Sequence, residues 1–236
     1  MSVLIVHHVA GNTLGPLEAV LTAKKLPFQY VDCHHLTPAR IELENARGLI
    51  ILGGKESAAD DQIHAFMQLE QQMIRNAIQQ NLPVFGICLG SQLIARSLGA
   101  TVERNRLNGQ DVKEIGWTPL MLTEAGKADP VLSRLEGAPQ FQWHEDTFHL
   151  PPDAVHLAAS ELCPRQAYKL NHPGGKTYAV QFHPEVSLPV IQAWLRASNS
   201  LDPARKATIW AESKQSFQQR HAASYAMFQA FCDLAF

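Results

Sequence analysis

Two patterns of apolar and polar positions alternate along residues 1–100. Short apolar runs, bounded by polar residues or glycine, are typical of strands buried on both faces of a sheet. These runs lie at residues 3–6, 28–33, 48–52 and 83–87. The stretches between them predict helices over residues 15–25, 60–80 and 91–98. The alternation predicts an α/β fold with a doubly wound, mostly parallel sheet flanked by helices, and a site at the carboxyl ends of the strands.

The helix expected over residues 60–80 begins with Asp60 and Asp61, which suit a helix N-terminus, and Gly99 is a suitable cap after residue 98. From residue 102 to about 178 the pattern changes to short strands, turns and prolines. We interpret this part as antiparallel extensions of the sheet.

The last 40 or so residues have a helical pattern. Its candidate buried positions are Trp194, Leu195, Ile209, Trp210, Phe217, Tyr225, Phe228 and Phe231. We therefore expect a single domain over residues 1–236, with a core to about residue 195 and a helical extension over 196–236. The extension either packs on the domain or forms a homodimer interface, and the core interpretation is the default.

Composition is that of a globular protein. Hydrophobic residues make up 46% of the 236, and 20 basic and 22 acidic residues leave a formal charge of −2. This balance gives no reason to expect nucleic acid or an anionic membrane as partner. No apolar run approaches the ~20 residues of a membrane span, and residues 1–6 lack the basic region of a signal peptide. Four scattered cysteines suit a reducing compartment, so we expect a cytoplasmic protein.

The segment 83–92 turns from the predicted strand into the predicted helix at a cysteine. Gly86 and Gly90 stand two residues to either side of Cys88, which is the spacing of a nucleophile elbow with sulfur in place of the serine oxygen. Glycines are needed because a Cβ would clash with the neighbouring strand and helix. The first amides and the dipole of the helix favour a thiolate. The alternative is a structural cysteine, since free cysteines are commonly buried.

A histidine and a carboxylate follow the apolar run at residues 177–180. Residues two apart on an extended segment project to the same side, so His183 and Glu185 face one way. Pro184 favours extended backbone at His183. This is the base with its orienting carboxylate that an activated cysteine requires, whereas the alternative is an ordinary polar loop. With Cys88, the pair predicts a Cys-His-Glu triad.

These motifs resemble those of the class I glutamine amidotransferases. The glycine pair at 53–54, the segment 86–92 and the segment 183–185 carry the resemblance, which spans residues 1 to about 195. Within the family, the nearest likeness is to stand-alone domains similar to the amidotransferase part of GMP synthase. The resemblance implies the flavodoxin-like fold of this family.

The resemblance also implies roles for the triad. Cys88 would attack the side-chain amide of glutamine, giving a γ-glutamyl thioester and ammonia, and the thioester would be hydrolysed to glutamate. His183 would act as general base and then as acid, oriented by Glu185. Many members carry His at the position of Ser91. Because this position only flanks the elbow, we expect the difference to affect specificity rather than hydrolysis.

The attack develops an oxyanion that needs two hydrogen-bond donors. One would be the backbone N–H of Leu89, the residue after the nucleophile. The Gly53-Gly54 pair follows a core strand, and its backbone can approach a substrate closely, although a plain turn is the commoner use of two glycines. With the resemblance, Gly54 is favoured, and Gly53 stays an alternative donor. The family usually has proline soon after the glycines, where this chain has Lys55.

Four further residues are candidates for substrate binding. Gln92 lies one helical turn beyond Cys88, so its side chain can reach back toward the pocket. The resemblance assigns Gln92 to the α-amino acid end of the substrate, and it places Trp143, His144 and Glu145 in a loop that touches the same end. The alternatives are a solvated glutamine, a core tryptophan and an ordinary polar turn.

Two histidine pairs, His7-His8 and His34-His35, raise the question of a metal site. Adjacent histidines on a strand point to opposite faces, so each pair is a poor chelate. The cysteines form no C-x-x-C pair. We therefore expect no metal and no cofactor.

Three functions fit these residues. The first is glutamine hydrolysis that delivers ammonia to an acceptor. The sequence contains no G-x-x-x-x-G-K-[ST] phosphate loop, so that use of ammonia requires a separate synthetase as partner. The second is hydrolysis of a γ-glutamyl peptide bond, which uses the same triad and differs mainly in the room for the leaving group. The third is a silent binding or regulatory domain, which an intact Cys-His-Glu set disfavours.

Overall fold

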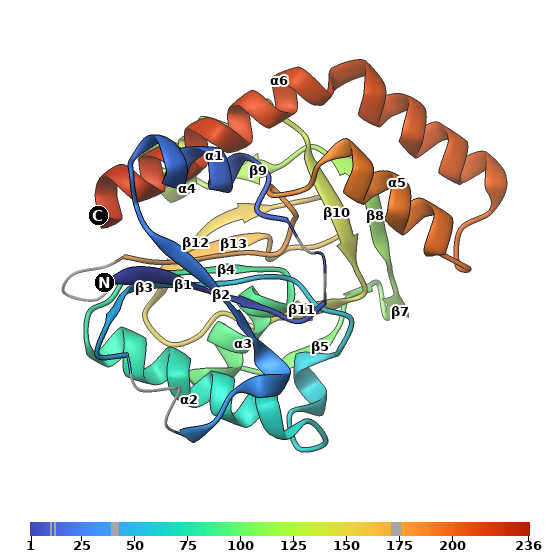
Figure 1. Cartoon of the computed structure of the whole chain (residues 1–236). Coiled ribbons are helices and arrows are strands. Elements are labelled where there is room, and N and C mark those ends of the chain that lie inside the picture. The colour runs from blue at the N-terminus through green and yellow to red at the C-terminus, as the bar shows by residue number, and fades with distance from the viewer. Residues whose placement is uncertain (10, 12, 39–42, 171–175) are drawn as a thin grey trace.

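The computed structural model describes residues 1–9, 11, 13–38, 43–170 and 176–236 (Figure 1). Within these residues, eight strands form a central sheet in the spatial order β2-β1-β3-β4-β14-β13-β12-β9. Their bounds are β1 (Ser2–His7), β2 (Phe28–Asp32), β3 (Ala46–Ile51), β4 (Val84–Ile87), β9 (Met121–Leu122), β12 (Ala154–Ala159), β13 (Ala167–Leu170) and β14 (Thr177–Val180).

Parallel pairing joins the strands at the centre of the fold. β1 pairs with β2 and β3, β3 with β4, and β4 with β14, all in parallel. β4 and β14 are buried at every position, as expected of strands covered on both faces. β13, β12 and β9 continue the sheet with antiparallel pairing. The predicted doubly wound, mostly parallel α/β fold with an antiparallel extension is confirmed.

The region between residues 102 and 178 is more divided than predicted. Only β9, β12 and β13 extend the main sheet, whereas six other short strands of the described residues form separate two-stranded sheets. These are β5 (Val102–Arg104) with β11 (Asp146–Phe148), β6 (Arg106–Leu107) with β7 (Gln110–Asp111), and β8 (Glu114–Thr118) with β10 (Gln140–His144). Two of these pairs, β5 with β11 and β8 with β10, supply residues to the site described below.

Helices cover both faces of the main sheet (Figure 1). They are α1 (Pro16–Ala23), α2 (Ala65–Gln79), α3 (Leu89–Ser97), α4 (Glu124–Ala128), α5 (Leu188–Ala197) and α6 (Pro203–Ala235), with 3-10 turns η1 (Cys33–His35), η3 (Ala58–Asp60) and η4 (Leu132–Leu135). α1 and α6 pack on one face through an apolar cluster that contains Leu17, Phe85 and Phe228. α2 and α3 pack on the other through a cluster that contains Ile74, Leu93 and Ile51.

The start of α2 corrects the sequence prediction. The helix begins at Ala65, after the N-cap residue His64, and not at Asp60. Asp60 ends the η3 turn, and Asp61 is buried, where its carboxylate accepts hydrogen bonds from the Arg96 guanidinium at 2.9 and 3.1 Å. The Asp61 carboxylate, which the sequence pattern assigned to the start of α2, therefore forms an ion pair with Arg96 on α3.

The C-terminal helix α6 packs along the domain. Of the eight predicted buried positions in the helical region, Leu195, Ile209, Phe228 and Phe231 are buried, and the other four are half-buried. The rings of Phe228 and Phe231 lie 5.5 and 4.9 Å from that of Phe85 on β4. In the described ranges, no helix combines the length and the apolar character needed to cross a membrane.

Candidate active site

Cys88 forms the corner between β4 and α3. β4 ends at Ile87, α3 begins at Leu89, and Cys88 between them has a φ of 52° and a ψ of −110°. A positive φ is uncommon for a residue with a side chain and costs on the order of 1–3 kcal/mol. The corner has the strained strand-to-helix geometry of a nucleophile elbow, as the glycine spacing predicts.

Gly86 and Gly90 allow this corner to form. A Cβ on Gly86 would lie 2.5 Å from Cδ1 of Ile94, and one on Gly90 would lie 2.3 Å from the carbonyl oxygen of Ile51. The second contact is with the backbone of β3, which cannot move aside as a side chain can. The helix therefore approaches the sheet as closely as it does only because both positions lack a side chain.

Hydrogen bonds fix the backbone of this corner. The backbone N–H of Cys88 donates to the carbonyl of Val180 at 2.8 Å, and the Ser91 hydroxyl donates to the carbonyl of Cys88 at 2.6 Å. The Tyr168 hydroxyl in turn donates to the carbonyl of Ser91 at 3.0 Å. Cys88 thus occupies a fixed position at the N-terminus of α3, where the first helical N–H groups have no partner within the helix.

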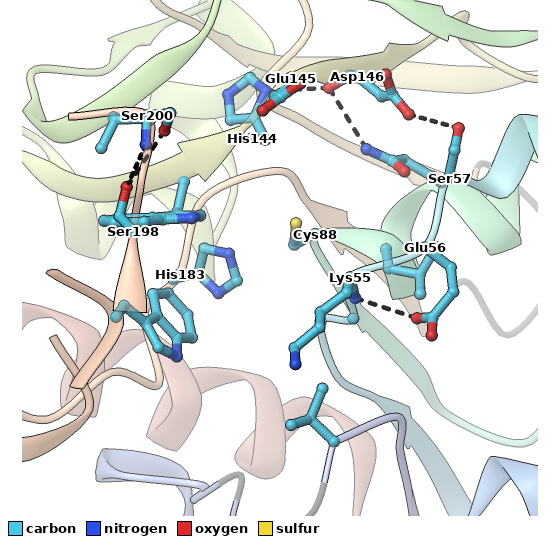
Figure 2. Close-up of a pocket in the computed structure, with 18 of the residues that line it drawn as sticks. Lys55, Glu56, Ser57, Cys88, His144, Glu145, Asp146, His183, Ser198 and Ser200 are labelled. Atoms are coloured by element: carbon cyan, nitrogen blue, oxygen red, sulfur yellow. Dashed lines mark hydrogen bonds between the residues drawn. The ribbon is translucent and has the colours of Figure 1, made fainter. Parts of the chain in front are cut away.

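The order of strands brings the histidine to the cysteine. β14 lies beside β4 in parallel, with Val180 in register with Ile87. The carboxyl ends of these neighbouring strands meet at one edge of the sheet, so the residues that follow them converge. Figure 2 shows Cys88 and His183 next to each other, and their side chains interact electrostatically.

His183 is paired with Glu185 in a nearly closed environment. Nδ1 of His183 lies 2.7 Å from Oε1 of Glu185, and the two residues are 5% and 6% exposed. Burial alone would lower the pKa of His183, but the carboxylate of Glu185 and the neighbouring Cys88 outweigh it and raise this pKa to about 10. The edge of the imidazole packs on Trp194, with ring centroids 4.9 Å apart. At neutral pH His183 is therefore an imidazolium beside the sulfur.

The Gly53-Gly54 loop follows β3 and packs against both groups. A Cβ on Gly53 would lie 2.9 Å from Cε1 of His183 and 3.5 Å from Cβ of Cys88. A Cβ on Gly54 would lie 2.4 Å from Cδ2 of Leu89. The backbone of this loop therefore borders the position at which a substrate carbonyl would meet the sulfur.

A cavity of about 750 Å³ opens at this edge of the sheet. Its volume falls within the roughly 300–1,000 Å³ of small-molecule sites. The cavity is lined by the three triad residues, Cys88, His183 and Glu185. It is also lined by every residue proposed from sequence to bind the oxyanion or the substrate, namely Gly53, Gly54, Leu89, Gln92, Trp143, His144 and Glu145. The structure thus brings these predicted residues to one cavity, while their individual roles stay predictions.

One contact to the thiol was not predicted from the sequence. The Gln181 side-chain amide donates toward Sγ of Cys88 at 3.7 Å, and its oxygen accepts a hydrogen bond from the Gln92 amide at 3.1 Å. Gln92 therefore lines the cavity, but its side-chain amide is hydrogen-bonded to Gln181. Gln181 is two residues before His183, so the same period-two rule that paired His183 with Glu185 places it on that side.

Comparison with known proteins identifies the family. The family model described as Glutamine amidotransferase class-I matches residues 18–197. The chain belongs to the class-I glutamine amidotransferase family. The glycine spacing of the elbow and the His-Pro-Glu segment, on which the resemblance was based, both lie inside the matched range.

Curated relatives agree with this assignment. The glutamine amidotransferase-like protein YfeJ of Salmonella typhimurium is 35% identical over 155 residues, covering 64% of this chain and 61% of that protein. The GMP synthase [glutamine-hydrolyzing] of the same species is 30% identical over 192 residues, covering 77% of this chain and 34% of the synthase. The chain therefore matches less than two thirds of YfeJ and about a third of GMP synthase.

Solved structures share the fold over the whole chain. A glutamine amidotransferase from Thermotoga maritima has a TM-score of 0.83 at 27% identity, covering 98% of this chain and 97% of its own. A glutamine amidotransferase from Methylobacillus flagellatus has a TM-score of 0.86 at 27% identity, covering 100% and 95%. Both likenesses include the C-terminal helix α6 that follows the residues matched by the family model.

One departure of this chain from the family pattern lies behind the elbow. Ser91, where many members carry His, is fully buried and does not line the cavity. Its hydroxyl donates a hydrogen bond to the carbonyl oxygen of Cys88. Ser91 therefore has no direct access to a substrate in this cavity, and an effect on specificity stays a prediction.

The loop expected at Trp143, His144 and Glu145 is mostly strand, because Trp143 and His144 end β10 and β11 begins at Asp146. Its side chains are buried or half-buried. Nε2 of His144 lies 3.0 Å from Oε2 of Glu114, and Nδ1 lies 3.0 Å from the carbonyl oxygen of Asp146. Both His144 and Glu114 are buried. Glu145 is half-buried and lines the cavity, and ion pairs, first with Lys113 and then with Arg104, lower its pKa. The second buried histidine–carboxylate pair was not predicted, because Glu114 is distant in sequence.

Among the residues that the structure describes, two groups of three side chains have metal-ligand atoms within 4.8 Å of one another. One is Asp32, Cys33 and His34, and the other is Glu114, His144 and Cys163. Burial raises the pKa of both thiols, for Cys33 to about 12, which disfavours the thiolate that a metal would need. In the second group, Glu114 and His144 already bind each other. Neither group is poised for a metal.

Proposed function

We propose that this chain hydrolyses the γ-amide of glutamine through a γ-glutamyl thioester on Cys88. The observation that supports the proposal is the convergence of the Cys88 thiol, the His183 imidazole and the Glu185 carboxylate at one cavity, from the ends of the neighbouring strands β4 and β14. This is a nucleophile, a base and an orienting group in one place. Membership of the class-I family supports the same chemistry.

In the acylation step, the sulfur of Cys88 attacks the δ-carbon of the substrate. A C–S bond forms, the carbonyl electrons move to oxygen, and the tetrahedral intermediate collapses as the C–N bond breaks. The leaving nitrogen takes the proton of the His183 imidazolium and departs as ammonia. Glu185 keeps the imidazole oriented for this transfer, because its carboxylate binds Nδ1 and leaves Nε2 directed toward the reaction.

The intermediate carries a negative oxygen that needs donors. We assign this role to the backbone N–H of Leu89, at the positive end of α3, and to that of Gly54 on the loop after β3. Both segments have fixed positions, because the Gly54 backbone packs against the Leu89 side chain. A pre-organised pair of donors stabilises the oxyanion without reorganisation during the reaction.

Deacylation repeats the chemistry with water. His183, neutral after the first step, takes a proton from water, and the resulting hydroxide attacks the thioester carbon. The C–S bond breaks, glutamate leaves and the thiolate returns beside a protonated His183. The sum is substrate plus water giving glutamate plus ammonia. A synthetase is the proposed acceptor of the ammonia, because the related protein of Salmonella typhimurium is a glutamine-hydrolysing GMP synthase.

A second candidate function is hydrolysis of γ-glutamyl peptides. Glutamine would fill only part of a cavity of about 750 Å³, which continues past the triad to Ser198, Asn199 and Ser200 between α5 and α6. The same triad would expel an amine in place of ammonia. The size of the cavity is the observation that favours this form of the reaction.

The test is a substrate panel with the purified chain. Glutamine, γ-glutamyl dipeptides and glutathione conjugates are assayed for ammonia, released amine and glutamate, with Cys88→Ala as the control for background hydrolysis. Ammonia from glutamine supports the first function, and amine from the dipeptides supports the second. If none of these substrates turns over faster with the native chain than with Cys88→Ala, the proposed function is wrong.

A further inference from the structure

Lys55 presents a cation to the active-site cavity without an ionic partner. It lines the cavity, is exposed, and forms no ion pair with any residue that the structure describes. Arg104 also lines the cavity, but its guanidinium forms ion pairs with Glu145 at 2.8 Å and with Asp146 at 3.3 Å. An uncompensated ammonium on the wall of a cavity attracts an anionic group of a bound molecule.

Neighbouring acidic groups do not neutralise Lys55. The Glu56 carboxylate accepts a hydrogen bond from the backbone N–H of Lys55 at 3.1 Å and contributes to the raised pKa of His8, so it faces its own loop. Asp60 also lines the cavity but forms no ion pair with Lys55. Ser198 and Ser200, on the wall beside His183, are uncharged (Figure 2).

The position of Lys55 in the cavity indicates which part of a substrate it meets. Lys55 and Asp146 lie on opposite sides of Cys88 in Figure 2. On the Asp146 side, Arg104, Glu145 and Asp146 offer charges of both signs, which match the α-amino and α-carboxylate groups of a glutamyl residue. With this end of the substrate bound there and its δ-carbon at Cys88, the leaving group extends toward Lys55.

We propose that Lys55 binds a carboxylate on the leaving amine, which makes the preferred substrates γ-glutamyl amino acids and peptides with a free carboxylate. This inference rests on the proposed function in its peptide-hydrolysing form. Lys55 acts in binding, since the amine that departs with this carboxylate still takes its proton from His183. The Gly53-Gly54 backbone beside Cys88 and His183 anchors the loop that carries the ammonium, so Lys55 is held near the scissile bond.

The experiment compares two substrates that differ only in this charge. γ-Glutamyl-glycine and γ-glutamyl-glycinamide are hydrolysed by the native chain, Lys55→Gln, Lys55→Arg and the control Lys127→Gln, which removes an exposed charge on α4. We expect the native chain to favour the carboxylate over the carboxamide by roughly fivefold in kcat/KM, mainly through KM, as for a partly exposed ion pair. Lys55→Gln should lose this preference, whereas Lys55→Arg and Lys127→Gln should keep it.

Salt provides a second readout. Added NaCl should reduce the preference of the native chain for the carboxylate and leave Lys55→Gln unaffected, because only the former depends on an ion pair. Three outcomes would overturn the role of Lys55 but leave cysteine-dependent hydrolysis intact. Lys55→Gln could retain the preference for the carboxylate, or the native chain could hydrolyse both substrates at equal rates. The native chain could also hydrolyse glutamine but neither γ-glutamyl compound. Failure of the native chain on glutamine and on every γ-glutamyl compound would instead remove the proposed function, and this inference with it.

Discussion

Nδ1 of His183 lies 2.7 Å from Oε1 of Glu185, with both residues almost fully buried. The carboxylate is the main group that raises the pKa of the imidazole against the effect of burial, to about 10. A charged histidine at neutral pH requires such a partner, because an unpaired buried imidazolium would lose its proton. The pair therefore determines the pH range in which His183 can protonate a leaving amine.

Glu185→Gln should shift the pH profile of the reaction. Without the carboxylate the pKa of His183 falls, so the basic limb of kcat/KM moves to lower pH. The same pairing stabilises the fold below pH ~6.5, and that contribution is lost as the pH rises through about 10, because the folded-state pKa is the higher one. We expect roughly a tenfold to hundredfold loss of activity at pH 9 and a smaller loss at pH 6. An unchanged basic limb would show that Glu185 does not control His183.

Cys88→Ala should abolish hydrolysis while the fold survives. Cys88 is the cysteine that lines the cavity, whereas Cys33, Cys163 and Cys232 are buried elsewhere, and burial raises the pKa of each of these three thiols. Iodoacetamide should therefore label the native chain once per molecule and the variant hardly at all, with an unchanged circular dichroism spectrum. Rapid labelling of Cys88→Ala would place the reactive thiol elsewhere.

Gln181→Met should weaken the nucleophile without removing it. The amide of Gln181 donates toward Sγ of Cys88 at 3.7 Å, and Met keeps the approximate volume of the side chain while losing the donor. We expect roughly a tenfold slower alkylation of Cys88 and a comparable fall in kcat. Gln72→Met on the exposed face of α2 is the control, and it should change neither rate. Equal alkylation rates for all three chains would contradict this contact.

How much of this site is predictable depends on whether its contacts are local. Gly86, Cys88 and Gly90 belong to one short turn, and His183 and Glu185 to one extended segment, so spacing alone identifies both groups. That the two groups meet depends on the pairing of β4 with β14, which residue spacing does not predict. The resemblance implied the triad, but not this pairing.

The missed features are the non-local ones. Glu114 binds His144 across the β8–β10 pair, and Asp61 binds Arg96 on α3 rather than capping α2. Short strands such as β5 and β11 carry little pattern of their own, so tertiary packing decides whether they join the main sheet. Sequence periodicity indicates which face a residue occupies, but not the partner that it meets there.

Glu70→Gln should destabilise the fold in a pH-dependent manner. Nε2 of His8 lies 3.0 Å from Oε2 of Glu70, with both side chains fully buried. Burial would lower the pKa of His8, but the Glu70 carboxylate outweighs it and raises that pKa above its usual value. The contribution of the pair is therefore complete below pH ~6.5 and is lost as the pH rises through the raised pKa. We expect a loss of about 3 kcal/mol in urea unfolding at pH 6, and a smaller one at alkaline pH.

An exposed pair of the same chemistry is the control for Glu70→Gln. Nε2 of His149 lies 2.6 Å from Oε1 of Glu103, with side chains 49% and 45% exposed. Glu103→Gln should cost less than about 1 kcal/mol, because water screens this pair. If both substitutions cost the same at pH 6, burial of the His8–Glu70 pair does not add to its strength. A pH-independent loss for Glu70→Gln would show that His8 is uncharged.

Gly90→Ala should disrupt the elbow through a backbone clash. Its Cβ would lie 2.3 Å from the carbonyl oxygen of Ile51, so α3 would have to move away from β3 and carry Cys88 with it. We expect a loss of about 3 kcal/mol in urea unfolding, with hydrolysis falling further than stability explains. Gly137→Ala is the matched control, since its Cβ meets open space and the φ of 71° is its main cost, about 1 kcal/mol. Equal stability of the two variants would mean that helix and sheet are not in the close contact on which the position of Cys88 depends.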